Sequence, residues 1–108
     1  MFALLLGVTL QTVGERPCDI YDAAGTPCVA AHSMTRALYA KYSGPLYRVI
    51  RASDNATKEV PVLSAGGAAD GAAQAAFCAG TGCVVDRIFD QSSHSNHIDP
   101  APGGGAHH

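Results

Sequence analysis

The chain carries, at residues 18–33, the stretch Cys18-Asp19-Ile20-Tyr21-Asp22-Ala23-Ala24-Gly25-Thr26-Pro27-Cys28-Val29-Ala30-Ala31-His32-Ser33. Two cysteines bracket its first part, and the other two cysteines of the chain, Cys78 and Cys83, also lie close together. Such short spans favour two local disulfides, Cys18–Cys28 and Cys78–Cys83. Because disulfides persist in oxidising compartments, the pattern predicts a secreted, extracellular chain built mainly of strands and loops.

The four cysteines could instead be the ligands of a zinc ion. Structural zinc sites take cysteine pairs with two to four residues between the ligands. Nine residues separate Cys18 from Cys28, so only Cys78 and Cys83 approach that spacing. We therefore favour disulfides over a metal site.

Length and charge restrict the classes of partner. A chain of 108 residues is one domain at most. Its net charge is −2 and it has no basic stripe or polybasic run, which argues against nucleic acid and membrane surfaces as partners. Aromatic residues are 6% of the chain and Trp is absent. A complete sugar-binding site usually offers aromatic stacking platforms, so their scarcity suggests that part of such a site is missing.

An apolar run, residues 2–10, opens the chain. It is too short for a membrane-spanning helix, and its length fits the apolar core of a signal peptide, so we predict a leader over residues 1–17. The fit is imperfect, since no Lys or Arg precedes the run and no A-x-A cleavage site follows it. The alternative is a buried N-terminal strand.

Periodicity predicts a short sheet with helical insertions. Helical spacing of apolar residues predicts a helix over 29–42, and alternation predicts a strand over 46–51. Residues 59–63 read as an edge strand because Pro61 cannot donate to a central ladder. A short helical segment is expected over 72–79 and the strongest strand over 83–90. The glycine-rich residues 103–105 do not resemble the end of a domain, so we expect a sequence that stops early.

Two groups of residues invite a catalytic interpretation. His32 and Ser33 are adjacent and therefore point to different sides, and no G-x-S-x-G motif is present, so we expect structural roles for both. Asp86 and Asp90 would stand roughly 13 Å apart on a strand. The carboxylate pairs of glycosidases lie about 5–9.5 Å apart. We therefore assign no catalytic dyad here.

Two polar segments complete the set of candidates. Residues 90–97 are dense in Asp, Gln, Ser, Asn and His, which suits a cation or sugar hydroxyls but also suits a loop held by its own side chains. We favour the loop. Asn55-Ala56-Thr57 is an N-x-T sequon, which in a secreted eukaryotic chain predicts an exposed, N-glycosylated Asn55.

The same residues resemble a known family, glycoside hydrolase family 54, the α-L-arabinofuranosidase B enzymes. The resemblance runs in order from Cys18 to Gly104 and includes both cysteine pairs. It is carried by Cys18-Asp19-Ile20-Tyr21, Gly25-Thr26-Pro27-Cys28-Val29-Ala30-Ala31-His32-Ser33, Thr35-Arg36-Ala37-Leu38-Tyr39, Tyr42-Ser43-Gly44-Pro45-Leu46-Tyr47, Arg51-Ala52-Ser53-Asp54, Ala65-Gly66-Gly67, Phe77-Cys78, Asp90-Gln91-Ser92 and Asn96-His97.

This resemblance implies a mainly β fold, a concanavalin-like β-sandwich catalytic module followed by an arabinose-binding β-trefoil. Residues 18–108 would be the N-terminal part of that module, with one or two short helices and disulfide staples. It implies a secreted retaining hydrolase that removes terminal α-L-arabinofuranosyl residues from arabinoxylan and arabinan in the plant cell wall, with no metal and no organic cofactor.

The sequence departs from the family pattern in one respect. The family's nucleophile, its general acid/base and a disulfide between adjacent cysteines lie downstream of the matched region, and this chain has no Cys-Cys dipeptide. We therefore assign no catalytic residue and expect the 108 residues alone to be inactive. The alternative function is a non-catalytic relic or a small secreted carbohydrate-binding module.

Overall fold

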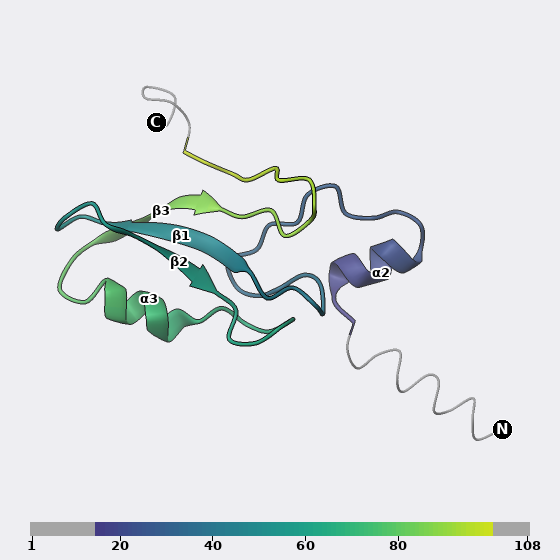
Figure 1. The fold of residues 1–108 in the computed structure, drawn as a ribbon, viewed down its shortest axis with the longest axis horizontal. Coiled ribbons are helices and arrows are strands. Elements are labelled where there is room, and N and C mark those ends of the chain that lie inside the picture. Colours follow the sequence, from purple (N-terminus) through teal and green to yellow (C-terminus); the bar gives the residue numbers. More distant parts are fainter. Residues whose placement is uncertain (1–14, 101–108) are drawn as a thin grey trace, which may run out of the picture.

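The computed structural model describes residues 15–100 as a small sheet flanked by two short helices (Figure 1). The elements follow in the order α2 (Pro17–Ala23), β1 (Pro45–Arg51), β2 (Thr57–Pro61), α3 (Gly71–Phe77) and β3 (Cys83–Ile88). The expected mainly β fold with one or two short helices and two disulfides is confirmed. The apolar run at residues 2–10 and the glycines at 103–105 lie outside the described residues.

The sheet is antiparallel, with strand order β2-β1-β3. Val49 of β1 stands opposite Lys58 of β2 on one side and Val85 of β3 on the other. The prediction that β2 is an edge strand is confirmed, and Pro61 closes the strand where a missing N–H costs least. Each predicted strand overlaps the observed one, and their ends differ by two residues at most.

A compact apolar cluster holds the sheet to the segments around it. Its buried members are Ala37, Leu46, Tyr47, Val49, Val60 and Val62. Leu46 and Tyr47 are adjacent and both buried, so the first half of β1 is covered on both faces. Burying each large side chain of this kind contributes about 1.5–3 kcal/mol.

Helix α3 covers one face of the sheet. Asp70 caps its N-terminus by accepting a hydrogen bond from the Ala73 N–H (3.1 Å). The Tyr47 hydroxyl donates to Gln74 Oε1, and the Arg51 guanidinium lies over the Phe77 ring, 4.4 Å from its centroid. The short helix expected over 72–79 is therefore confirmed.

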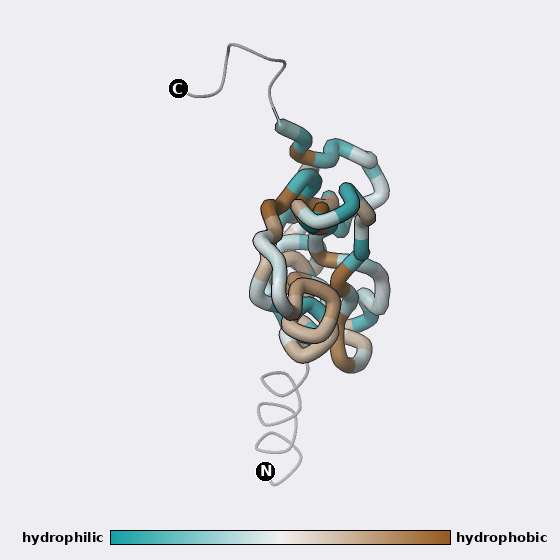
Figure 2. Tube along the Cα trace, turned by 90° about the vertical axis from the view of Figure 1, so that its left-hand side faces the viewer, coloured by the Kyte–Doolittle hydropathy of each residue, from teal (hydrophilic) through white to brown (hydrophobic). Residues whose placement is uncertain are grey.

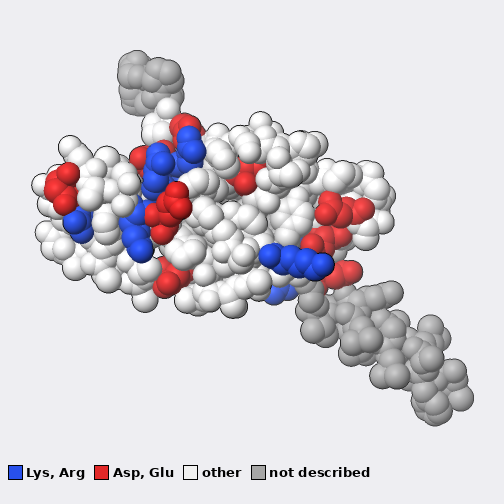
Figure 3. Space-filling view, in the orientation of Figure 1, with Lys and Arg blue, Asp and Glu red and all other residues white. Residues whose placement is uncertain are grey.

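The other face of the sheet carries charge. Arg48 on β1 pairs with Asp86 on β3 (2.7 Å), and Arg87 pairs with Asp99 (2.6 Å). Figure 3 shows acidic and basic side chains gathered side by side on one face of the molecule. Asp86 occupies a bulge, since Arg48 stands opposite Arg87 and Val49 opposite Val85.

The helix predicted over residues 29–42 is wrong. Those residues run as irregular chain with one isolated bridge, Arg36 to Ala68. Their backbone donors find partners far away in the sequence: the Ala37 N–H donates to the Gly67 carbonyl (2.9 Å). These tertiary hydrogen bonds replace the i to i−4 ladder that apolar periodicity alone suggested.

A helix that the sequence reading missed stands earlier, at α2. Pro17 occupies its first position, where its missing N–H is no loss, and Asp19 Oδ2 accepts a hydrogen bond from the Arg16 N–H (3.0 Å). The Cys18–Cys28 disulfide and the Ala40 N–H, which donates to Asp19 Oδ2 (2.7 Å), fix α2 to the rest of the chain. Proline followed by an acidic residue was the signal for this helix.

The hydropathy of the described chain changes over short intervals. In Figure 2, short apolar and hydrophilic stretches alternate along the tube. None of the helices within residues 15–100 has the length and apolar character needed to cross a membrane.

Two glycines at positive φ provide a test of this packing. Gly66 (φ +73°) is buried, and a Cβ there would lie 2.5 Å from the Ala40 carbonyl oxygen, whereas Gly25 (φ +82°) has nothing within 4 Å. Gly25→Ala is expected to lower the free energy of unfolding by about 1 kcal/mol, the cost of the backbone conformation alone. Gly66→Ala adds the clash and is expected to cost about 3 kcal/mol or more. Urea unfolding of both variants measures the difference, and equal losses would contradict the packing described here.

Candidate functional site

A buried carboxylate, Asp90, joins the end of the sheet to the segment that follows the first disulfide. The Asp90 side chain is 5% exposed. Its Oδ1 accepts hydrogen bonds from the N–H groups of Ala31 (2.7 Å) and Ser92 (2.9 Å), and its Oδ2 accepts one from the Asn96 N–H (2.9 Å). The Ser92 hydroxyl adds a further bond of 2.8 Å. One side chain thus organises the loop over residues 90–97 and ties it to residue 31.

Gln91 also binds backbone far away in the sequence, at residues 36–38. Its Oε1 accepts a hydrogen bond from the Leu38 N–H (2.7 Å), and its Nε2 donates to the Arg36 carbonyl (3.2 Å). Its own N–H donates to the Ala31 carbonyl (2.8 Å). Asp90 and Gln91 together satisfy four backbone groups of this segment, which are the N–H and carbonyl of Ala31, the carbonyl of Arg36 and the N–H of Leu38. These bonds replace part of what a helix would supply.

The hydrogen bonds to Asp90 decide its protonation. Burial opposes the charged form, but the N–H groups of Asn96, Ser92 and Ala31 and the Ser92 hydroxyl favour it more strongly. The pKa of Asp90 is therefore held well below its ordinary value of 3.8. The carboxylate is therefore ionised at neutral and mildly acidic pH, where it serves as a hydrogen-bond acceptor and not as a proton donor.

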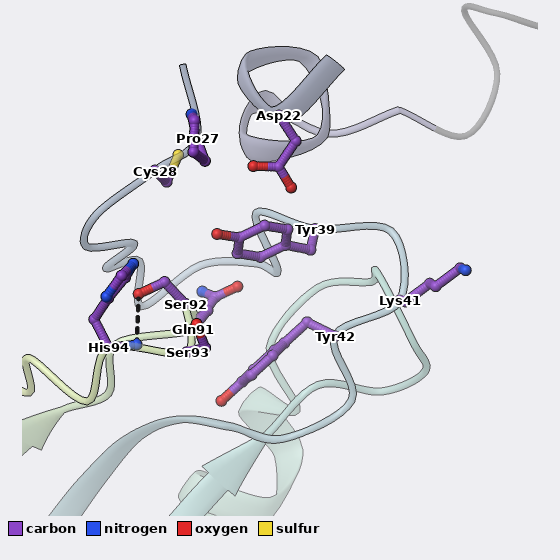
Figure 4. Close-up of a pocket in the computed structure, with 10 residues that line it drawn as sticks. All are labelled: Asp22, Pro27, Cys28, Tyr39, Lys41, Tyr42, Gln91, Ser92, Ser93 and His94. Carbon is purple, nitrogen blue, oxygen red and sulfur yellow. Dashed lines mark hydrogen bonds between the residues drawn. The ribbon is translucent and has the colours of Figure 1, made fainter. Parts of the chain in front are cut away.

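A cavity of about 380 Å³ lies beside this junction. Figure 4 shows the Tyr39 ring between the Asp22 carboxylate and the Tyr42 ring, with Gln91 and Ser92 nearby and Lys41 pointing away. Pro27, Cys28, Ser93 and His94 complete the lining. Aromatic rings beside polar groups suit a neutral polar ligand such as a sugar.

Both phenols of the cavity stay neutral. Burial, followed by the charges of Asp22, Asp90 and Asp19, raises the pKa of Tyr39. Burial also raises the pKa of Tyr42, with smaller effects from Glu59 and Asp90. The Tyr42 hydroxyl donates to the Pro45 carbonyl, so its ring is fixed as a wall of the cavity.

The carboxylates of the chain do not form a hydrolytic pair within residues 15–100. Six of the nine acidic side chains accept hydrogen bonds or pair with arginine: Asp19, Asp54, Asp70, Asp86, Asp90 and Asp99. The other three, Glu15, Asp22 and Glu59, are exposed, and only Asp22 lines the cavity. Glycoside hydrolysis needs two carboxylates across one bond, and one acidic side chain, Asp22, lines the described cavity.

The candidate residues from the sequence have structural partners. His32 Nε2 donates to the Asn96 carbonyl (2.7 Å), and Ser33 Oγ accepts a hydrogen bond from the Thr35 N–H (3.2 Å) in a turn. Asp86 pairs with Arg48 while Asp90 binds backbone, so the two aspartates are not a dyad. The polar loop over residues 90–97 is held by its own side chains, as expected.

The cysteines form the two expected disulfides, Cys18–Cys28 and Cys78–Cys83. No free cysteine remains among the described residues. In that part of the chain, no cluster of three or more His, Cys, Asp or Glu side chains is placed to hold a metal ion. The cysteines therefore act as staples for the loops on either side of the sheet.

Comparison with protein families identifies relatives of this chain. The family model for the catalytic part of α-L-arabinofuranosidase B matches residues 17–108. The chain belongs to the α-L-arabinofuranosidase B family.

Several curated relatives of this chain come from fungi. The chain is 59% identical over 105 residues to a probable α-L-arabinofuranosidase B of Aspergillus fumigatus, a match that covers 97% of this chain and 21% of the relative. It is 57% identical over 104 residues to the α-L-arabinofuranosidase B of Emericella nidulans, covering 94% and 20%. The chain thus spans about a fifth of the length of the relatives it matches.

Solved structures of the family share the fold. One is an arabinofuranosidase complexed with arabinofuranosyl-α-1,2-xylobiose, and another is a glycoside hydrolase family 54 α-L-arabinofuranosidase soaked with a cyclic sulfate inhibitor. Each superposes with a TM-score of 0.80 at 55% identity and covers 81% of this chain and 18% of the solved chain. The described sheet is thus similar to a part of these larger enzymes, in line with the expected fragment of a β-sandwich.

Sequence reasoning identified the polar loop but missed the organising roles of Asp90, Gln91 and Asp19. A polar pair at the end of the strongest predicted strand was the available signal, because such side chains stand where a strand enters a loop. Their partners at Ala31, Leu38 and Ala40 lie 59, 53 and 21 residues away in the sequence, and no local pattern reveals them.

Replacement of the buried carboxylate tests its role. Asp90→Asn places an amide group against backbone donors and is expected to lower the free energy of unfolding by about 2–4 kcal/mol at neutral pH. Because the folded-state pKa lies below the ordinary 3.8, the charge stabilises fully above about pH 4 and this contribution is lost as pH falls through the folded-state pKa. Unfolding measured against pH should therefore show a shallower acid slope in the variant.

The matched control is Asp22→Asn, an exposed carboxylate on α2 that lines the same cavity. This substitution should change the free energy of unfolding by less than about 0.5 kcal/mol. If the two substitutions had equal effects, or if Asp90→Asn kept the full acid slope, the role assigned to Asp90 would be wrong.

Proposed function

We propose that residues 18–108 are the N-terminal part of the catalytic module of a secreted α-L-arabinofuranosidase. The substrate class would be arabinose-containing polysaccharide of the plant cell wall, arabinoxylan and arabinan, from which terminal α-L-arabinofuranosyl residues are removed with retention of configuration. The family match over residues 17–108 is the observation that carries this proposal.

The substrate class draws support from two relatives and one solved structure. The Aspergillus and Emericella proteins are named α-L-arabinofuranosidase B, and one superposable structure is a complex with arabinofuranosyl-α-1,2-xylobiose. The ligand in that complex is an arabinofuranosyl group attached to xylobiose. Transfer of that substrate to this chain is our inference from 55% identity over the shared segment.

The role that we assign to these residues is structural support. Asp90 and Gln91 lock the loop after β3 onto residues 31–38, and the two disulfides fix the loops at either end of the sheet. We propose that this unit positions catalytic groups carried elsewhere in the module. By itself the 108-residue chain is expected to lack glycosidase activity, since its described acidic residues offer no pair across one cavity.

Export is part of the same proposal. Two disulfides in a domain of this size suit an oxidising compartment, and the apolar run at residues 2–10 suits a signal peptide. We therefore place the protein outside the cell.

A chimera provides the sharpest test. Residues 18–100 of this chain would replace the matching segment of the Aspergillus fumigatus relative, and the product would be assayed on 4-nitrophenyl α-L-arabinofuranoside. The chimera is expected to hydrolyse the substrate within about tenfold of the parent, and the 108-residue chain alone is expected to give no turnover. A chimera carrying Asp90→Asn serves as the comparison that disturbs the support without touching any catalytic group.

Two outcomes would contradict the proposal. Turnover by the 108-residue chain alone would show that a catalytic pair is present in it. A chimera that is folded and disulfide-bonded but inactive would show that these residues no longer support the family's chemistry, as a non-catalytic relic would.

The cavity beside Tyr39 favours a second candidate, a small secreted carbohydrate-binding module. It combines two phenol rings with exposed polar groups, as sugar sites do. Retardation of the 108-residue chain in gels containing arabinoxylan, lost in Tyr39→Ala but kept in Tyr21→Ala, would support this function. Tyr21 is the matched control because it is exposed on α2 and does not line the cavity.

A further inference from the structure

The turn between β1 and β2 is a rigid, exposed tip. It lies at the end of the sheet away from α2 (Figure 1). The Arg51 guanidinium pairs with the Asp54 carboxylate (2.8 Å), and Asp54 Oδ1 also accepts a hydrogen bond from the Ala56 N–H (3.1 Å). The Arg51 guanidinium, followed by the Ala56 N–H, lowers the pKa of Asp54 to about 2, so the pair persists into acid.

The same tip is bound to the loop before β3. The Ala52 N–H donates to the Gly82 carbonyl (2.8 Å), and the Ser53 N–H donates to Thr81 Oγ1 (3.1 Å). These contacts hold the tip in one place relative to the second disulfide loop.

Asn55 is presented at this tip. It is exposed and has φ +59°, and its N–H donates to the Arg51 carbonyl (2.9 Å). Its carboxamide has no hydrogen-bond partner within residues 15–100, so that group is free to react. Thr57, the hydroxyl residue of the sequon, is also exposed, at the first position of β2.

A shallow apolar hollow adjoins Asn55. Its volume is about 250 Å³, and Asn55 itself lines it together with Ile50, Arg51, Ala52, Gly82, Cys83 and Val84. The Arg51 guanidinium is held by Asp54, so the exposed surface beside Asn55 is mainly apolar. Val84 is 64% exposed, which leaves an apolar surface open to water beside the sequon. One face of a pyranose ring consists of C–H groups, whereas its hydroxyls point outward, so a sugar is suited to cover such a surface.

We propose that Asn55 carries an N-linked glycan whose first N-acetylglucosamine lies over the hollow beside Val84. The sequon, the free carboxamide and the adjoining apolar surface point to the same occupant. This inference rests on the proposed export of the protein and not on its hydrolase activity.

The chemistry is a group transfer from a lipid pyrophosphate-linked oligosaccharide. The carboxamide nitrogen of Asn55 forms a bond to C1 of the N-acetylglucosamine while the bond between C1 and the pyrophosphate oxygen breaks. The nitrogen loses one proton, and the lipid pyrophosphate leaves with the electron pair of the broken bond. No oxidant or reductant takes part.

Attachment is tested on the full-length protein secreted from a yeast or filamentous fungus. Trypsin cleaves after Arg51 and Lys58, so residues 52–58 form one peptide that contains the only sequon in the chain. After endoglycosidase H treatment, we expect this peptide to carry one N-acetylhexosamine in more than half of the molecules. Thr57→Ser keeps the hydroxyl and should keep the sugar, whereas the isosteric Thr57→Val should lose it. An unmodified peptide from the secreted protein would overturn the proposal.

Packing of the sugar is tested by melting temperature. The protein that retains one N-acetylglucosamine is expected to melt about 1–2 °C above Asn55→Gln, and the difference should vanish when both carry Val84→Ser. Equal melting temperatures of the glycosylated protein and Asn55→Gln would overturn the packing. A secreted, active enzyme without the sugar would contradict this inference alone, whereas a glycosylated, inactive enzyme would contradict the proposed function alone.

Discussion

The fold depends on one buried carboxylate that finds all its partners in loops. Asp90 follows the end of β3, and its carboxylate accepts hydrogen bonds from the N–H groups of Ala31, Ser92 and Asn96. A buried charge is tolerated only when such bonds replace water, and each of these bonds in turn orders backbone that belongs to no helix or strand. The loop over residues 90–97 and the irregular chain after the first disulfide are therefore one unit, and neither has an obvious reason for its conformation without the other.

The two faces of the sheet differ in character, since one is covered by a helix and the other carries ion pairs. Helix α3 lies on the face that carries Tyr47 and Val49, whereas the pairs Arg48–Asp86 and Arg87–Asp99 occupy the other face (Figure 1). Those pairs are partly exposed, so they contribute little to stability and instead keep that face polar. The cavity beside Tyr39 lies at the far end, next to the Asp90 junction, and it contains the Asp22 carboxylate without a second acidic group. These features are the basis for our proposal that the unit is a structural support within the α-L-arabinofuranosidase B family.

The sequence alone predicted those elements whose structure depends on residues close together along the chain. Alternation in residues 46–51, a proline in β2 and short cysteine spans predicted the strands, the edge and both disulfides. It failed for residues 29–42, where apolar spacing suggested a helix but the backbone bonds go to Gln91, Asp90 and Gly67. It also missed α2, whose ends are set by Pro17 and Asp19. The polar groups of the cavity come from three separate segments, and no local pattern brings Tyr39 to His94.

The central claim is that a single ionised carboxylate binds three backbone amides at once. The most direct measurement is the pH dependence of the amide proton chemical shifts of Ala31, Ser92 and Asn96 in nuclear magnetic resonance spectra. If Asp90 accepts from all three, these resonances stay downfield through pH 3.8 and then move together at one lower midpoint. Separate midpoints, or a common midpoint at the ordinary value for an aspartate, would contradict the account.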